Sequence, residues 1–432
     1  MSSFCRNSIL LIFALLCISA KYSAAFLFDD EPSLVSENAR LAALGGINIV
    51  IEEYDNEINL YDFGELSAGV IDDDGGKSSI YVRGRYGIDG VQEISSATEW
   101  SGGDLSAGGI YKYMGRWAIG GSSMIARRDV GFNSWTEMTH ETYDIRNYRD
   151  TVILALQVSN WLKLGVRGAY RRDVLKKTEY INYWEGDDKT WLVDPSVSIT
   201  LPGSKWSLGF GYAYTDIGYF SYDDNTENFR LPIVYRGQII SFGIKVNHKR
   251  TYRQDGYMSG KETFGCVRGI CKVPIFDKTV NIGLQVDRDI TYRFRENHGP
   301  IYNWFMDFGG GVALVDEKFG LIGAQLQHRI YHHYAPAYPK QTIFNLGLEL
   351  DPFKFIPVRI GYLFHSYNPE GSYSEQNIVT MGFGVYFLDK RAEFDFAYNL
   401  RKNSLRWYST FFSYDIYFDT EHIWELSARI TF

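Results

Sequence analysis

Alternation of large apolar residues with small or polar ones, at a period of two, runs through most of this chain. The stretch 239–247 reads Ile-Ile-Ser-Phe-Gly-Ile-Lys-Val-Asn, and comparable stretches recur up to the last residue. Successive side chains of a β-strand point to opposite faces, so each stretch predicts a strand with one apolar face. Such strands have two ways to cover those faces: two sheets pack as a sandwich, or one sheet closes into a barrel in lipid.

Aromatic residues and connection lengths favour the barrel over a secreted β-sandwich. Trp161, Trp206 and Trp424 stand near strand ends, where the aromatic girdles of membrane barrels lie. The connections alternate between short turns, such as 202–204, and long polar segments, such as 127–149. We therefore predict an all-β fold, a transmembrane antiparallel up-and-down barrel. It has about fourteen strands, in a range of about fourteen to eighteen that depends on which segments are split.

Composition excludes other classes of protein. Aromatic residues make up 16% of the chain, which is too many for a disordered protein. Beyond the N-terminal region, no apolar run reaches the roughly 18 residues that a transmembrane helix needs. The formal net charge of -8 provides no basic surface, so we expect no nucleic-acid partner.

The two ends of the chain predict its location. Residues 1–25 have the features of a secretory signal peptide: Arg6, a short apolar core, and small residues up to Ala25, after which we expect cleavage. The chain ends inside its last predicted strand at Phe432, and a terminal aromatic residue is typical of the assembly signal of bacterial outer-membrane barrels. We therefore expect a Gram-negative outer-membrane protein, with membrane lipid, glycolipid and the barrel assembly machinery as partners.

Two cysteines remain after signal cleavage, Cys266 and Cys271. They lie in a glycine-rich stretch that we interpret as a loop. In an exported protein, two nearby cysteines predict a disulfide bond.

The faces assigned to the lumen carry charges of both signs. Such charges ordinarily pair and hold a barrel wall together, and a mixed lumen does not resemble a channel that selects one sign of charge. We place ten charged residues there: Lys163, Arg167, Lys245, Asp287, Glu349, Arg359, Glu393, Asp395, Glu425 and Arg429.

Residues 26–70 differ from the predicted wall, which we assign to 71–432. They contain small residues, the pair Gly45-Gly46 and a short apolar stretch. This composition suits a segment folded inside the barrel, so we predict an N-terminal plug.

This N-terminal segment is similar to a region of known outer-membrane proteins. Residues 39–46, Ala-Arg-Leu-Ala-Ala-Leu-Gly-Gly, and the acidic stretch that follows resemble the N-terminal region of FadL-type and PorV/PorQ-type outer-membrane proteins. Those proteins continue into Asn-Pro-Ala-Gly, whereas here Asn59 begins Asn-Leu-Tyr-Asp-Phe-Gly. The stretches 344–350, 358–362, 381–385 and 394–399 are similar to the C-terminal half of the PorV-like group. The resemblance implies a fourteen-stranded barrel with an inward plug. It also implies either passage of hydrophobic compounds or presentation of secreted proteins at the surface.

Catalytic chemistry is not apparent in the sequence. We find no Gly-x-Ser-x-Gly motif and no nucleophile paired with a base, and we expect neither enzyme activity nor a cofactor. His328, His332 and His333 cluster near a strand end, and we interpret them as exposed residues rather than a metal site. Residues 72–76 resemble a calcium loop only loosely, because they lack its spaced ligands.

Three functional hypotheses follow. The first is a plugged channel or transporter for hydrophobic small molecules. The second is a surface-anchoring or secretion-accessory barrel that binds protein partners. The third is a purely structural outer-membrane protein.

Overall fold

The computed structural model describes most of the chain after residue 38. The described residues are 39–44, 46–50, 66–69, 78–92, 96–134, 139–179, 182–217, 224–253, 258–295, 298–316, 320–332, 340–353, 355–368, 372–388, 391–408 and 413–432. The predicted signal peptide, with its cleavage site, lies outside them.

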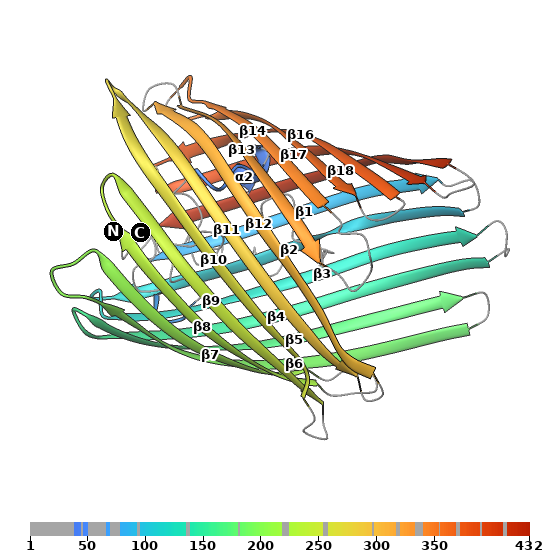
Figure 1. The fold of residues 1–432 in the computed structure, drawn as a ribbon, viewed down its shortest axis with the longest axis horizontal. Helices are drawn as coiled ribbons and strands as arrows, with labels where there is room; N and C mark the ends of the chain where they lie inside the picture. The colour runs from blue at the N-terminus through green and yellow to red at the C-terminus, as the bar shows by residue number, and fades with distance from the viewer. Residues whose placement is uncertain are drawn as a thin grey trace, which may run out of the picture.

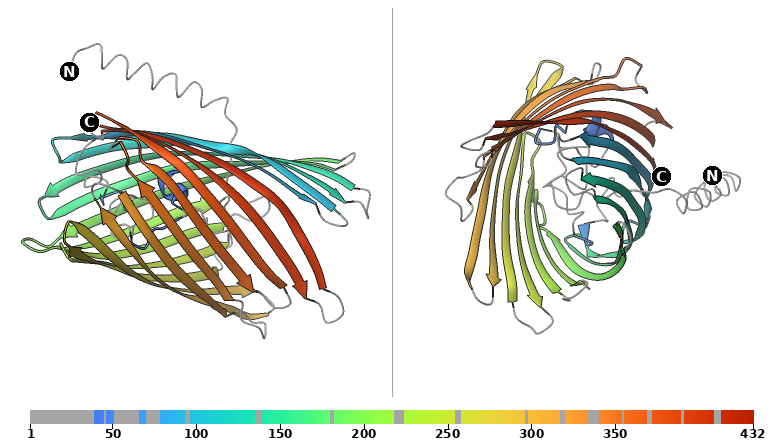
Figure 2. Two further views of the ribbon diagram at one scale, coloured as in Figure 1. Left: turned by 90° about the horizontal axis from the view of Figure 1, so that it is seen from above. Right: turned by 90° about the vertical axis from the view of Figure 1, so that its right-hand side faces the viewer.

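The molecule is a closed antiparallel barrel of 18 strands, in which each strand pairs with its neighbours in the chain and β1 pairs with β18 (Figures 1 and 2). The strands are β1 (Ser79–Gln92), β2 (Ser96–Tyr113), β3 (Trp117–Ser134), β4 (Thr139–Ser159), β5 (Leu162–Glu179), β6 (Asn182–Thr200), β7 (Trp206–Ile217), β8 (Asp224–Arg236), β9 (Ile240–Arg253), β10 (Met258–Ile275), β11 (Lys278–Arg295), β12 (His298–Asp316), β13 (Gly320–His332), β14 (Lys340–Leu350), β15 (Val358–Asn368), β16 (Ser372–Phe387), β17 (Ala392–Tyr408) and β18 (Ser413–Thr431).

Closure of the barrel joins the two ends of the wall. Ile80 of β1 pairs with Ile430 of β18, and the ladder continues to Ile88 opposite His422. Beyond the strands, the backbone N–H of Phe432 donates to the carbonyl of Ser78 at 2.9 Å, and that of Ser78 donates back at 3.1 Å. Among the 18 described strands no edge is left, so each of them has two hydrogen-bonded neighbours. The predicted all-β antiparallel barrel is therefore confirmed.

The predicted count of about fourteen strands is wrong, and the 18 strands of the structure are the upper end of the predicted range. Three of the 18 strands have sequences with weak strand signals. Pro195 lies inside β6 and Pro232 inside β8, and proline lacks the N–H that a ladder uses. Around Pro195 the ladder to β7 is interrupted between Val193 and Ser196. The third strand, β10, has glycines on its outer face, which lowers the contrast between the two faces.

The prediction of a disulfide bond is wrong, and the strand β10 is the reason. Cys266 and Cys271 both lie within β10 rather than in a loop, and both are free thiols. They are five residues apart, an odd number, so their side chains point to opposite faces of the wall. A strand rises about 3.3 Å per residue, which separates the two Cα atoms by roughly 16 Å. A disulfide needs Cα atoms within about 7 Å.

The segments that we predicted as long polar loops are mostly polar ends of strands. The stretch 127–149, for example, belongs to β3 and β4 except for residues 135–138, which are not described. On its outward face, Arg127 pairs with Asp144 at 3.2 Å, and Arg146 pairs with the same carboxylate. Outward charges of this kind suit a part of the wall that faces water.

An apolar band covers the outer face between those polar ends and the short turns. On β4, Val152, Leu154 and Val158 are 57%, 48% and 53% exposed, whereas the inward Ala155 is buried. Aromatic pairs border the band on both sides: the rings of Tyr170 and Trp191 are 4.4 Å apart near the polar ends. Near the short turns the ring of Trp206 lies 5.2 Å from those of Tyr235 and Phe242.

One helix is described, α2 (Ala39–Ala43), and it lies inside the ring of strands (Figure 2, right). It contacts β15, β16, β17 and β18. Within the described part of the chain, no helix has the length and apolar character needed to cross a membrane.

Candidate functional site

The described part of the N-terminal region follows the inner wall of the barrel. We call residues 39–44, 46–50 and 66–69 the N-terminal segment. Its helix α2 packs Ala39, Ala42 and Ala43 against an apolar patch on the inner wall, and all six side chains of this cluster are buried. The wall residues of the patch are Leu363 of β15, Ile378 of β16 and Ala397 of β17.

A buried ion-pair network joins α2 to the same part of the wall. Arg40 contacts Glu349 of β14 at 2.6 Å, and Glu349 also accepts from Arg359 of β15 at 2.6 Å. Arg359 is fully buried and reaches onward to Asp395 of β17 at 2.5 Å. Its guanidinium also donates to the Tyr386 hydroxyl at 2.9 Å. Two guanidinium groups and two carboxylates neutralise one another, which is what burial of charges requires.

Beyond the helix, polar wall side chains bind the backbone of the segment. The Gln325 side-chain oxygen accepts from the backbone N–H groups of Asn48 and Ile49, both at 2.9 Å. The Gln325 amide nitrogen donates to the carbonyl of Gly46 at 3.2 Å. On β11, the Asn281 amide donates to the carbonyl of Val50 at 3.0 Å. These bonds replace the water that the backbone groups lose on burial.

Residues 66–69 dock on another part of the wall. The hydroxyls of Ser67 and Ser196 of β6 are 2.8 Å apart, and the backbone N–H of Ala68 donates to Ser196 at 2.9 Å. Leu66 is buried with Val234 of β8 and Ile270 of β10. The N-terminal segment therefore contacts inward side chains from β17 to β11 and again from β5 to β10.

Glycine is required where the segment approaches the wall most closely. A Cβ atom at Gly347 of β14 would lie 2.5 Å from the carbonyl oxygen of Leu44. A Cβ atom at Gly165 of β5 would overlap the backbone of Ser67 and Ala68. Sequence reasoning missed both positions, although each stands on the predicted inner face.

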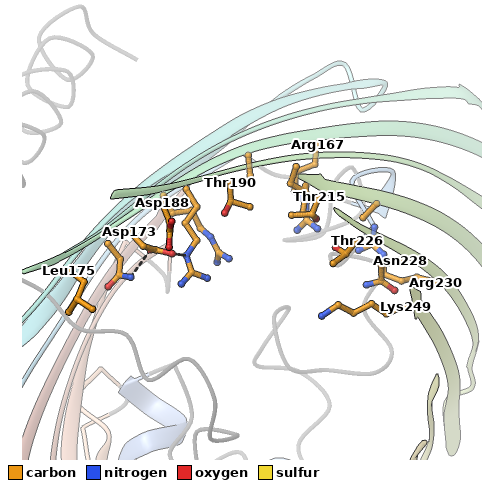
Figure 3. A pocket seen from close by; sticks show the side chains of 16 residues that line it. Arg167, Asp173, Leu175, Asp188, Thr190, Thr215, Thr226, Asn228, Arg230 and Lys249 are labelled. Carbon is orange, nitrogen blue, oxygen red and sulfur yellow. Dashed lines mark hydrogen bonds and ion pairs between the residues drawn. The ribbon is translucent and has the colours of Figure 1, made fainter. Parts of the chain in front are cut away.

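A second feature of the lumen is a cavity of about 740 Å³ beside residues 66–69. Side chains from opposite stretches of wall point into it (Figure 3). Arg167 and Arg230, in its wall, both pair with the fully buried Asp194, Arg167 at 2.8 Å. The Asp194 backbone carbonyl in turn accepts from the Ser67 hydroxyl at 3.2 Å. The cavity is lined by Asn147, Arg149, Arg167, Ala169, Arg171, Asp173, Leu175, Asp188, Thr190, Leu192, Ala213, Thr215, Thr226, Asn228, Arg230 and Lys249.

Ten charged residues are predicted for the lumen. Four of them lie in the two features described above. Glu349, Arg359 and Asp395 form the network that holds Arg40, and Arg167 lines the cavity. The side chain of Asp287 accepts from Gln285 at 2.6 Å, and that of Glu425 lies 3.5 Å from Asn399. The structure places the others as follows: Lys163 is buried, and Lys245, Glu393 and Arg429 are partly exposed.

Some of the residues singled out from the sequence lie outside the described part of the chain, and others do not form a metal site. Gly45, Asn59 and His333 are not among the described residues, and neither is the stretch 72–76. Gly46 is described, and its φ of 76° is one that favours glycine. His328 contacts the Thr342 hydroxyl at 3.0 Å. Among described residues, no group of three or more His, Cys, Asp or Glu is arranged to hold a metal ion.

No protein-family model matches the chain, and no curated protein matches it in sequence. Among solved structures it is similar to OpdL of Pseudomonas aeruginosa, at 9% identity and a TM-score of 0.46, over 82% of this chain and 98% of that one. It is also similar to the toluene transporter TodX of Pseudomonas putida, at 10% identity and a TM-score of 0.42, over 95% of this chain and 98% of that one. The monoaromatic hydrocarbon channel CymD shares 12% identity, with a TM-score of 0.39, over 93% of this chain and 98% of that one.

These likenesses are distant in both sequence and shape. The fold and the site therefore rest on this chain's own residues. The resemblance to FadL-type and PorV/PorQ-type proteins stays a prediction, and the fourteen strands that it implies are replaced by 18.

Proposed function

We propose that this chain is an outer-membrane β-barrel whose N-terminal region, residues 26–70, acts as a plug that controls the passage of small molecules through the lumen. The observation that carries the proposal is the docking of the N-terminal segment on the inner wall. The segment is held by the ion pair of Arg40 and by backbone hydrogen bonds to the wall side chains of Gln325 and Ser196. These contacts are buried or half-buried. A segment held by such contacts occupies lumen space in one defined position.

The outer face supports a location in lipid. The stretch from Trp424 of β18 to Phe432, just beyond its end, is nine residues long, and its alternate side chains face outward. This length is close to the roughly 9–11 residues that a tilted strand needs to cross a bilayer. A closed barrel leaves no unpaired backbone edge in hydrocarbon. These two features support a location in a Gram-negative outer membrane.

The nature of the solute and of any protein partner stays a prediction. The sequence predicts hydrophobic compounds as solutes. As partners it predicts secreted proteins, glycolipid and the assembly machinery. The described cavity is lined largely by charged and polar side chains, which favours a polar solute in that part of the lumen.

A reversible lock on the segment tests the proposal. The hydroxyls of Ser67 and Ser196 are 2.8 Å apart, so cysteines at both positions need only a small adjustment to reach the S–S bond length of about 2.05 Å. We would introduce Ser67→Cys and Ser196→Cys into a chain that also carries Cys266→Ser and Cys271→Ser. The full chain is reconstituted in planar bilayers and its potassium chloride conductance is recorded. Oxidation is expected to abolish channel openings, and a reductant is expected to restore them.

Two controls interpret the result. Each single cysteine variant should show no response to oxidant. Deletion of residues 26–70 should raise the conductance, because the lumen loses its docked segment. Unchanged conductance in both the oxidised lock and the deletion would rule out a gating role for the segment.

A further inference from the structure

The described side chains that line the lumen cavity carry an excess of positive charge. Five of its lining side chains are cationic and two are carboxylates, which leaves a net charge of about three positive. The fully buried Asp194, which pairs with two of the arginines, lowers that excess by one. The whole chain has a formal net charge of -8, so this excess is local.

The cations come from several strands and converge. Arg167 and Arg171 stand four residues apart on the inner face of β5, and their side chains are 29% and 30% exposed. Arg230 of β8 and Lys249 of β9 reach in from another stretch of wall (Figure 3). Because Asp194 is shared by Arg167 and Arg230, one carboxylate faces two guanidinium groups.

The ion-pair network at α2 differs from the cavity in its balance of charge. There, Arg40 and Arg359 meet Glu349 and Asp395, and the charges cancel inside a packed contact. In the cavity, Arg171 is paired with Asp173 at 2.6 Å, and Arg167 and Arg230 share the single carboxylate of Asp194. Among the described residues around the cavity, the cationic side chains therefore outnumber the carboxylates. A wall needs balanced charges, whereas a surplus around an open space favours a mobile counter-charge.

We propose that this cavity binds a small organic anion. The carboxylate or phosphate oxygens contact the guanidinium groups of Arg167, Arg171 and Arg230 and the Lys249 ammonium. Guanidinium groups bind such oxyanions through paired hydrogen bonds, which gives strength and orientation. The apolar part of the anion lies against Leu175, Leu192 and Ala213, which also line the cavity. The volume of about 740 Å³ lies within the roughly 300–1,000 Å³ of small-molecule sites.

The site lies next to the docked part of the N-terminal segment. Asp194, which pairs with Arg167 and Arg230, accepts the Ser67 hydroxyl through its backbone carbonyl. The anion site therefore deepens the proposed function, since a ligand here sits beside the segment that is proposed to control passage. Access of the ligand through the membrane rests on that proposed function, whereas binding itself does not.

Alternation along the strands offers a closely matched test. Arg171 and Lys249 face the cavity, while their neighbours Arg172 and Arg250 lie on the outward face. The test variant is Arg171→Gln with Lys249→Gln, and the control is Arg172→Gln with Arg250→Gln. Both lose the same charge from adjacent positions. Binding is measured by isothermal titration calorimetry on the full chain in detergent, with benzoate, phenyl phosphate, benzyl alcohol and benzylamine as probes.

We expect the native chain and the control variant to bind benzoate or phenyl phosphate, and neither the alcohol nor the amine. The stronger of the two anions identifies carboxylate or phosphate as the preferred group. The test variant should bind that anion at least about a hundredfold more weakly, because it loses two charge-assisted hydrogen-bond donors. Where the double variant does not fold, Lys249→Gln alone is compared with Arg250→Gln.

Three results would overturn the site: no anion binding to the native chain, equal binding of benzyl alcohol, or equal weakening in test and control variants. Because calorimetry needs no conductance, anion binding by a chain whose lock and deletion leave conductance unchanged would retain the site and reject the plug. The opposite pair of results would retain the plug and reject the site.

Discussion

Arg40 binds Glu349 through two hydrogen bonds, from Nε to Oε2 at 2.9 Å and from Nη2 to Oε1 at 2.6 Å. The two residues are separated by 309 positions in the chain, so this contact fixes the N-terminal helix to the strand β14. Both side chains are about nine-tenths buried. A paired guanidinium and carboxylate in such a place hold both position and orientation.

We predict that Arg40→Met releases α2 from the wall. Removal of one partner from a buried ion pair typically costs about 3–5 kcal/mol, because the other charge stays buried without compensation. Here Arg359 still pairs with Glu349, so we expect the lower end of that range. Hydrogen exchange of residues 39–50 should accelerate in the full chain, while the exchange of β1 and β18 stays slow. Slow exchange of residues 39–50 in the variant would show that the apolar cluster alone holds the helix.

A single methyl group at Gly165 should displace residues 66–69. A Cβ atom there would overlap the backbone of Ser67 and Ala68, so Gly165→Ala is expected to open the contact with Ser196. The matched control is Gly168→Ala on the same strand, where an added Cβ would meet nothing within 4 Å. Hydrogen exchange at Ala68 should rise by about tenfold or more in the first variant, because an amide exchanges faster once its hydrogen bond opens, and should stay unchanged in the second. An equal effect of both substitutions would point to strand β5 itself rather than to the docked segment.

The two cysteines should remain reduced after export. Cys266 and Cys271 point to opposite faces of β10, so the folded wall keeps their sulfur atoms apart. Protein denatured without reductant should be alkylated at both positions, as judged by mass spectrometry of the intact chain. A mass that corresponds to a disulfide would contradict the position of β10 in the wall.

The sequence predicts which face a residue occupies far better than which residues meet. Alternation placed Glu349, Arg359 and Asp395 on one face, because period two is a local property of a strand. It said nothing of Arg40, whose contact depends on where helix α2 docks on the inner wall. The Glu349–Arg359 contact depends on hairpin register, since these two residues pair directly between β14 and β15.

The cavity was missed for a related reason. Asp194, which binds both Arg167 and Arg230, lies in β6, one of the three strands that contain unfavourable residues for strand prediction. Without β6 and β8, neither Asp194 nor Arg230 had a predicted place. Their convergence with Arg167 is a property of the closed ring, and no single stretch of sequence carries it.

The cost of placing an arginine on the outer face should depend on its depth in the membrane. This dependence tests the lipid-facing surface directly. Val166 lies outward on β5, within the apolar band, and is 39% exposed. Tyr170 lies four residues further along the same face, where its ring pairs with Trp191 at the border of the band. An arginine near the bilayer centre destabilises a barrel by about 2–4 kcal/mol, whereas near the interface it costs roughly 0–1 kcal/mol.

We therefore expect Val166→Arg to lower the free energy of unfolding by about 2–4 kcal/mol and Tyr170→Arg by about 1 kcal/mol or less, apart from the loss of the aromatic pair. Urea unfolding in lipid vesicles, followed by tryptophan fluorescence, measures both values. The same pair in a detergent micelle is the control, because a micelle adapts around a charge and narrows the difference. Equal costs in vesicles would mean that β5 does not cross the bilayer at this depth, and the boundary of the apolar band near Tyr170 and Trp191 would have to be moved.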